Sequence, residues 1–160
     1  MSGLLSFPNP VNEKAARVVA GCVAAIGIVA LATSAHWLLV VLAAGFLLRV
    51  MSGPRLSPLG LLATRVVAPR LGPPTLVAGP PKRFAQAMGL AMTAAGAVLA
   101  LGFGAEGAAD VVLVVLVVAA TLESAFALCL GCKLFGVLMA AGLVPEEVCA
   151  QCANISLRQA

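Results

Sequence analysis

The sequence predicts an all-α fold: a four-helix transmembrane bundle with an interfacial helix between spans two and three and a short cytoplasmic helical tail. Three observations support this prediction. First, 62% of the 160 residues are hydrophobic and 10% are charged, which leaves too little polar surface for a soluble domain. Second, four apolar stretches approach the ~20 residues that a membrane-spanning helix needs. Third, the Lys and Arg residues, except Arg49, lie outside these stretches on one predicted side.

The four predicted spans cover residues 18–32, 36–51, 84–103 and 108–130. Small residues recur at four-residue spacing in the first and third spans, where they let helix backbones approach closely in lipid. These pairs are Gly21 with Ala25, Gly89 with Thr93, and Gly96 with Ala100. We therefore expect residues 1–144 to form a four-span membrane domain and residues 145–160 to form a cytoplasmic tail that contains cysteines.

The distribution of charge predicts the orientation. Lys14 and Arg17 precede the first span, and further basic residues lie between the second and third spans and after the fourth. Arg49 ends the second span, from where its long side chain can reach the same face. The opposite side carries only the acidic Glu106 and Asp110. The positive-inside rule then predicts a multi-pass protein of the inner (plasma) membrane with both termini in the cytoplasm.

Two features of the sequence have a second interpretation. Residues 1–35 could form a signal peptide, because Thr33-Ser34-Ala35 resembles a small-x-small cleavage site. The proline-containing N-terminus and the uncharged residues that follow favour a first span instead. The formal charge of +4 could indicate nucleic acid, but the basic residues border apolar segments, so anionic lipid headgroups explain it better.

The connection between the second and third spans predicts a short interfacial helix. Seven of the ten prolines fall between residues 51 and 82, which excludes a fifth membrane helix. Ser57 followed by Pro58 is a helix-start signal, and Leu59, Leu62 and Val66 recur at helical spacing. We expect a helix over residues 58–67 and an ordered or extended loop over residues 69–81 at headgroup level.

The fourth apolar stretch continues far beyond residue 130. A straight helix from residue 111 to residue 144 would measure about 50 Å, against about 30 Å for the hydrocarbon core. Gly131 is the predicted bend, after which residues 132–141 would lie along the interface until Gly142 and Pro145 end the helix. A straight helix that projects into the cytosol is the alternative.

Three motifs carry a resemblance to a known family. These are Arg70-Leu-Gly-Pro-Pro74, Pro81-Lys-Arg-Phe-Ala-Gln86 before an apolar helix, and Cys129-Leu-Gly-Cys132 after the fourth span. Together they resemble the domain-of-unknown-function family 4395 of bacterial four-pass membrane proteins over most of residues 9–140. The resemblance implies the four-span topology. It also implies sulfur chemistry by association, because family members resemble proteins often encoded beside thioredoxin-like and sulfurtransferase genes.

Two cysteine pairs, Cys129 with Cys132 and Cys149 with Cys152, are the main candidate for function. Cysteines three residues apart on a helix share a face, and the adjacent Lys133 would favour a thiolate. One pair could then exchange electrons or sulfur with a soluble thioredoxin-like or sulfurtransferase partner and pass them to the other pair. Whether such a component is an enzyme stays open at this point.

The same four cysteines have two other interpretations. The C-x2-C pairs, separated by sixteen residues, have a spacing typical of four-cysteine zinc sites. In that case the protein would be a non-enzymatic membrane scaffold or interaction protein, with its tail held by one zinc ion. The cysteines could also simply pack, as we expect of Cys22.

Glu123 is the acidic residue well inside a predicted span, and we expect it to pair, with Arg49 as the candidate, or to handle protons. On a regular helix it would lie about 120° from Cys129 and about 180° from Cys132. His36, beside Trp37, is expected to anchor a helix end. The predicted partners are the lipid bilayer and a soluble thiol protein, with no nucleic acid, and a homo-oligomer is compatible with the sequence.

Overall fold

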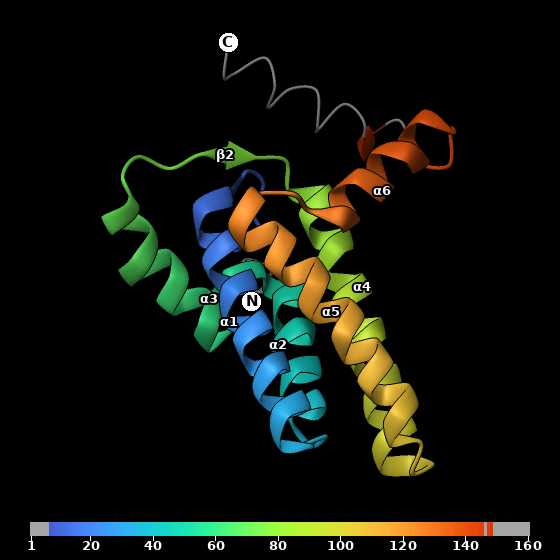
Figure 1. The fold of residues 1–160 in the computed structure, drawn as a ribbon. Helices are drawn as coiled ribbons and strands as arrows, with labels where there is room; N and C mark the ends of the chain where they lie inside the picture. Colours follow the sequence, from blue (N-terminus) through green and yellow to red (C-terminus); the bar gives the residue numbers. More distant parts are fainter. Residues whose placement is uncertain (1–6, 146, 149–160) are drawn as a thin grey trace.

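The computed structural model describes residues 7–145 and 147–148, and four long helices dominate it (Figure 1). α1 packs chiefly against α5 and α2 against α4, while α4 also contacts α5. The predicted all-α class and four-helix bundle are confirmed. The long helices are α1 (Glu13–Thr33), α2 (Leu38–Ser52), α4 (Gly79–Ala97, continued by a π-helical turn at Val98–Gly102) and α5 (Glu106–Phe126).

The helices overlap the predicted spans, but α1 and α4 each begin five residues earlier than predicted. α1 starts at Glu13 because Asn12 caps it, its side chain accepting a hydrogen bond from the Lys14 N–H at 3.1 Å. α4 starts at Gly79, so its first turns contain the basic Lys82 and Arg83. Both helices therefore extend beyond their apolar segments into turns that carry positive charge.

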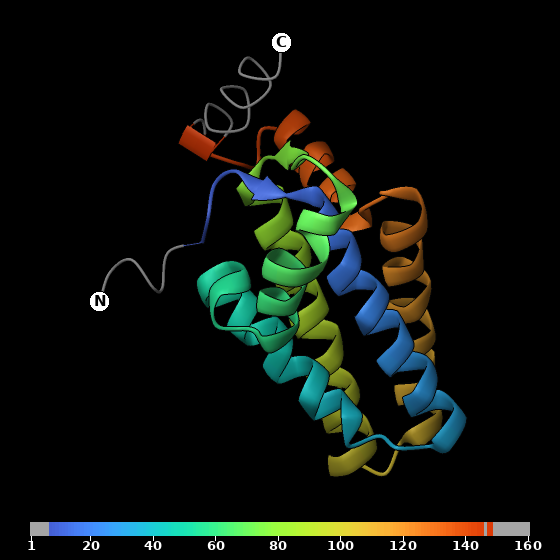
Figure 2. The same cartoon turned by 90° about the vertical axis from the view of Figure 1, so that its left-hand side faces the viewer.

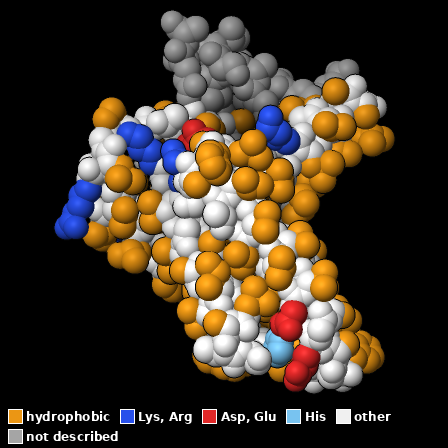
Figure 3. All heavy atoms as spheres, viewed as in Figure 1, with side chains coloured by type: hydrophobic (Ala, Val, Ile, Leu, Met, Phe, Trp, Pro, Cys, Tyr) orange, Lys and Arg blue, Asp and Glu red, His pale blue; other side chains and the backbone are white. Residues whose placement is uncertain are grey.

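Hydrophobic side chains are spread over the face of the bundle that Figure 3 shows, between its two charged ends. Val29, Val41, Val111 and Val118 are each about half exposed or more, at 52%, 48%, 64% and 53%. Within the described residues, four helical stretches are long and apolar enough to cross a membrane. A bilayer would remove this surface from water, so the structure fits a multi-pass membrane protein.

Charge separates along the bundle axis (Figure 3). Blue Lys and Arg side chains gather at the upper end, where red acidic atoms are also visible, while the lower end carries red acidic side chains and the histidine and shows no blue on this face. At that lower end, His36 Nε2 lies 2.9 Å from Asp110 Oδ1, which links the start of α2 to α5. This acid partner could not be predicted from the sequence, because the two residues are 74 positions apart. Trp37 is 60% exposed at the same boundary.

The segment between α2 and α4 contains the predicted helix. α3 (Pro58–Leu62) begins at Ser57, whose hydroxyl accepts the Gly60 N–H at 3.4 Å, as the Ser-Pro signal predicts. It continues through a π-helical turn (Ala63–Val67) and a 3-10 turn (Ala68–Leu71), past the predicted end. The chain then forms β2 (Leu76–Val77), antiparallel to β1 (Val11–Asn12), which crosses the top of the bundle (Figure 2).

The glycines of the predicted small-residue pairs pack closely against neighbouring helices, whereas Ala25 lies on an exposed face of α1. A Cβ added at Gly89 would lie 2.4 Å from a ring carbon of Phe46, and one at Gly96 would lie 3.2 Å from Leu39. Gly21 leaves room for Ser124 of α5 in the same way. Glycine at these positions lets α4 approach α2, and α1 approach α5, closely enough for backbone and side chain to meet.

The end of α5 differs from the prediction. α5 ends at Phe126 instead of residue 130, because Ala127 adopts a left-handed conformation (φ 56°) and its N–H bonds to the Leu122 carbonyl. A second helix, α6 (Leu130–Ala140), then leaves the axis of α5 and packs against α4 (Figure 1). The predicted bend at Gly131 is therefore wrong, and so is the straight projecting helix. The bend comes four residues earlier.

Candidate thiol site at the basic end of the bundle

Cys129 and Cys132 form the first turn of α6. Cys129 is the N-cap residue, and its Sγ accepts a hydrogen bond from the Cys132 N–H at 3.4 Å. The predicted span 108–130 includes Cys129 and places Cys132 just after its end; the turn at Ala127 instead separates both cysteines from α5. At a helix N-terminus, the free N–H groups and the helix dipole stabilise negative charge, so this location favours a thiolate at Cys129.

One hydrogen bond between the two thiols gives them different pKa values. The Cys132 thiol donates to the Cys129 sulfur, which lowers the pKa of Cys129 and raises the pKa of Cys132. Burial and the negative charge of Glu123 oppose the change at Cys129, and the positive charge of Lys82 supports it by less than Glu123 opposes it. Of the two thiols, Cys129 therefore ionises more readily and Cys132 less readily.

A buried ion pair lies beside the thiols. Lys82 Nζ is 2.7 Å from Glu123 Oε1, and their side chains are only 6% and 16% exposed. The predicted pairing of Glu123 with Arg49 is thus wrong. Because α4 begins at Gly79, Lys82 lies opposite the last turns of α5 and pairs with Glu123 in place of Arg49. Glu123 and Cys129 also line one cavity of about 150 Å³. Their predicted separation of about 120° around one regular helix does not apply, because α5 ends between them.

Both cysteines border an open groove at the basic end. Cys129, only 7% exposed, and the half-buried Cys132 line it together with Lys82 and Lys133. The predicted cation Lys133 is therefore present in the groove, but Lys82 is the cation that acts on both thiol pKa values. A groove that holds two thiols beside the exposed cation Lys133 and the Glu123-paired Lys82 can admit a partner's sulfur.

The comparison with protein families covers most of this architecture. The model of the family "Domain of unknown function (DUF4395)" matches residues 11–140. The chain belongs to this family. The DUF4395 match includes the four long helices, α6 and the Cys129–Cys132 turn, and it ends before Cys149 and Cys152. No curated protein and no solved structure matches the chain.

The second cysteine pair lies outside the described residues. The relay between pairs and the zinc site both depend on Cys149 and Cys152, so they stay predictions for this DUF4395 protein. Within residues 7–145 and 147–148, no three His, Cys, Asp or Glu side chains lie close enough to hold a metal ion.

Lys82 is the site residue that the sequence reasoning missed. It stands in the Pro81-Lys-Arg motif, and a lysine so close to an apolar helix could have been tested as the partner of Glu123.

Proposed function

We propose that this protein is a membrane-embedded dithiol exchanger. Cys129 and Cys132 would exchange electrons, or a persulfide sulfur, with a soluble thioredoxin-like or sulfurtransferase partner. The observation that carries the proposal is the position of the Cys129 sulfur. It caps the first turn of α6, accepts the Cys132 N–H and borders a groove with Lys82. Each of these features favours a thiolate, the reactive form in thiol exchange.

The exchange would take two displacement steps. The Cys129 thiolate attacks one sulfur of a partner disulfide, forming a mixed disulfide and releasing the other partner sulfur as a thiolate, which takes up a proton. Cys132 then loses its proton and attacks the Cys129 sulfur, forming an intramolecular disulfide and releasing the reduced partner. In the sulfur-transfer form, Cys129 attacks the outer sulfur of a partner persulfide, becomes a persulfide and releases the partner thiolate.

The groove would face the cytoplasm. The Lys and Arg side chains lie at the end of the bundle that carries α6 (Figure 3). The acidic residues Glu106 and Asp110 lie in the first turns of α5, at the other end. Positively charged loops remain on the cytoplasmic side during insertion. A cytoplasmic groove suits dynamic thiol exchange, since stable disulfides are rare in that compartment.

Mixed-disulfide trapping tests the exchange. The probe is a thioredoxin that lacks its second active-site cysteine and carries thionitrobenzoate on the first. In a background with Cys22, Cys149 and Cys152 changed to serine, Cys132→Ser is expected to displace the thionitrobenzoate and keep a stable adduct. The chain with both Cys129 and Cys132 should form the adduct transiently, because Cys132 resolves it. Non-reducing electrophoresis with timed quenching measures both.

The matched control is Cys129→Ser. It leaves Cys132, which is not the N-cap residue of α6 and whose pKa burial raises even without Cys129, so we expect adduct formation to be at least about tenfold slower. Equal trapping by Cys129→Ser and Cys132→Ser would contradict the assignment of Cys129 as the attacking thiol. Failure of both variants, with the fold intact, would contradict the exchange mechanism.

Alkylation tests the charge and the orientation together. With Cys129 as the single cysteine and serine at position 132, a membrane-impermeant maleimide should react in everted vesicles. In right-side-out vesicles it should not. Because the pKa of Cys129 is lowered from 9.0, the rate should reach its half-maximum below pH 9. Alanine at position 132 removes the hydrogen-bond donor, so the half-maximum should move to higher pH. Unchanged profiles, or reaction only in right-side-out vesicles, would contradict the proposal.

A further inference from the structure

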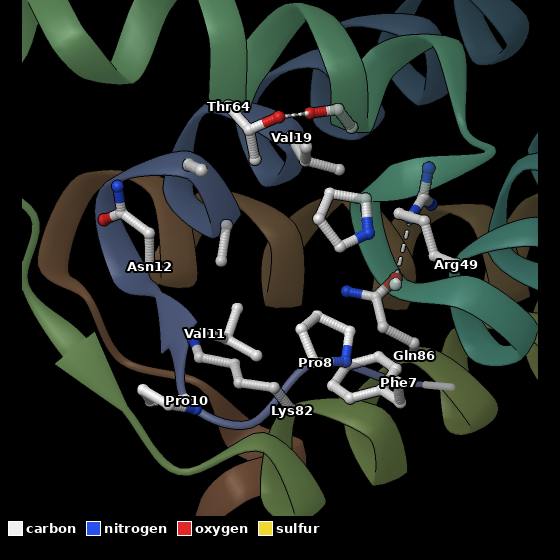
Figure 4. A pocket seen from close by; sticks show the side chains of 15 residues that line it. Phe7, Pro8, Pro10, Val11, Asn12, Val19, Arg49, Thr64, Lys82 and Gln86 are labelled. Atoms are coloured by element: carbon white, nitrogen blue, oxygen red, sulfur yellow. Dashed lines mark hydrogen bonds between the residues drawn. The ribbon is translucent and has the colours of Figure 1, made fainter. Parts of the chain in front are cut away.

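A second cavity, separate from the cysteines, lies among α1, α2, α3 and α4 at the basic end of the bundle (Figure 4). Its volume is about 140 Å³, close to that of cavities that hold a small ring-sized molecule. Most of its wall is apolar, and residues 7–11 form one side of it. The polar side chains in the wall include Arg49 and Gln86.

Arg49 is a buried cation that no carboxylate neutralises. Its residue is 4% exposed, and within the described residues no acidic side chain lies in ion-pair distance of it. Its Nε donates to Gln86 Oε1 at 2.8 Å and its Nη1 to Ser57 Oγ at 3.3 Å, but its buried Nη2 has no hydrogen-bond partner. The predicted reach of Arg49 to the membrane face is therefore wrong. Its guanidinium turns back along α2, against Gly45 and over the Phe46 ring.

A buried positive charge without a counterion is costly, so a site that keeps one is suited to an anion. Lys82, which also lines the cavity, is already neutralised by Glu123. Arg49 therefore leaves the cavity wall with one net positive charge. Neutral acceptors, the Gln86 and Ser57 oxygens, offset that charge only in part.

Gln86 presents a donor to the cavity because of Arg49. The Gln86 side-chain oxygen accepts from Arg49 Nε, which fixes the orientation of the amide. Its nitrogen is consequently turned away from Arg49 and toward the cavity (Figure 4). An anion placed there would receive an N–H bond from Gln86, with the guanidinium charge directly behind the amide.

We propose that this cavity binds the anionic end of an amphiphilic molecule, a carboxylate or a phosphate attached to an apolar group. The anionic oxygen would accept from the Gln86 amide beside Arg49. The apolar group would lie against Phe7, Val11 and Val19. The location at the basic end, level with the predicted headgroup region, suits molecules that already reside in the bilayer. The cavity contains no cysteine in its wall, so ligand binding here would be a function additional to the proposed thiol exchange.

Thermal unfolding in a non-ionic detergent tests the site, with four probes: hexanoate, hexyl phosphate, hexan-1-ol and inorganic phosphate. Hexanoate or hexyl phosphate at saturation should raise the unfolding midpoint by about 3 °C or more. Hexan-1-ol and inorganic phosphate should not, because each lacks one half of the ligand. A larger shift with hexyl phosphate identifies a phospholipid-like ligand, and a larger shift with hexanoate identifies a fatty acid.

The decisive variant is Gln86→Glu. Its carboxylate can accept from Arg49 where the amide oxygen does, so it neutralises the guanidinium internally, keeps the fold and removes the donor. We expect the anion-dependent shift to disappear and the apparent affinity to fall at least about tenfold. An undiminished shift in a folded Gln86→Glu variant would overturn the proposal.

A second variant fills the cavity from α1. Ala15→Leu places bulk in the cavity wall, whereas Ala25→Leu, in the same helix, places the same side chain on an exposed face. Ala15→Leu should lose the response to hexanoate and hexyl phosphate, and Ala25→Leu should keep it. Equal responses in the two variants would place the anion elsewhere and overturn the assignment, as would equal shifts from hexan-1-ol and hexanoate.

Discussion

Lys82→Met is expected to lower the free energy of unfolding by about 3–5 kcal/mol, because it leaves Glu123 buried without its cation. The pair is short, at 2.7 Å, and both side chains are largely removed from water. Methionine keeps most of the length of the lysine stem, so the loss of charge dominates over the loss of packing. Unfolding in mixed micelles of SDS and a non-ionic detergent measures the difference.

Two controls isolate the charge effect. The double variant Lys82→Met/Glu123→Gln should recover most of the lost stability, because no unpaired buried charge remains. Lys133→Met removes an exposed cation from the same groove and should change stability by less than about 0.5 kcal/mol. Equal losses for Lys82→Met and Lys133→Met would show that the ion pair does not stabilise the bundle.

The second large effect is expected from Gly131→Ala. A Cβ at position 131 would lie 2.6 Å from the Ala85 Cβ and 2.7 Å from its Cα, and backbone of α4 cannot move aside as a flexible side chain can. We expect a loss of about 1–3 kcal/mol or separation of α6 from α4. Separation should also weaken the contact of Phe84 with Phe135, whose ring centroids lie 5.5 Å apart, and raise the alkylation rate of Cys132.

Gly136→Ala is the matched control within α6. Nothing lies within 4 Å of a Cβ at that position, so alanine should stabilise the helix by up to about 1 kcal/mol through its higher propensity. If Gly131→Ala and Gly136→Ala had the same effect on stability and alkylation, close packing of α6 on α4 would not position the thiols.

The membrane bundle could be predicted because its signals are local. Apolar runs of span length, prolines between residues 51 and 82, and the Ser57-Pro58 start signal each act within a few residues. The turn at Ala127 could not be predicted in this way. Alanine has no preference for a left-handed conformation, and Gly131 offered a more obvious breaker. The docking of α6 on α4, which uses Gly131 for close approach, depends on tertiary packing.

The cysteines of the candidate site could be predicted from the sequence, but the pairing of its charged residues could not. The spacing of Cys129 and Cys132 is a local pattern, whereas the pairing of Lys82 with Glu123 joins residues 41 positions apart. The same limit applies to Arg49, whose inward turn depends on Gln86 and Ser57 as hydrogen-bond acceptors. Residue type alone indicated a buried acid that needs a partner, but several basic residues at one end of the bundle were possible partners.

The path of the chain through α6 gives the thiols a mechanical connection to the bilayer. Cys129 is tied covalently to α5 through the short turn at Ala127, while α6 rests chiefly on α4. The cysteine turn therefore bridges two neighbouring membrane helices. A thinner or thicker lipid layer changes helix tilt, and a change in the tilt of α5 relative to α4 would exert a force on the cysteine turn.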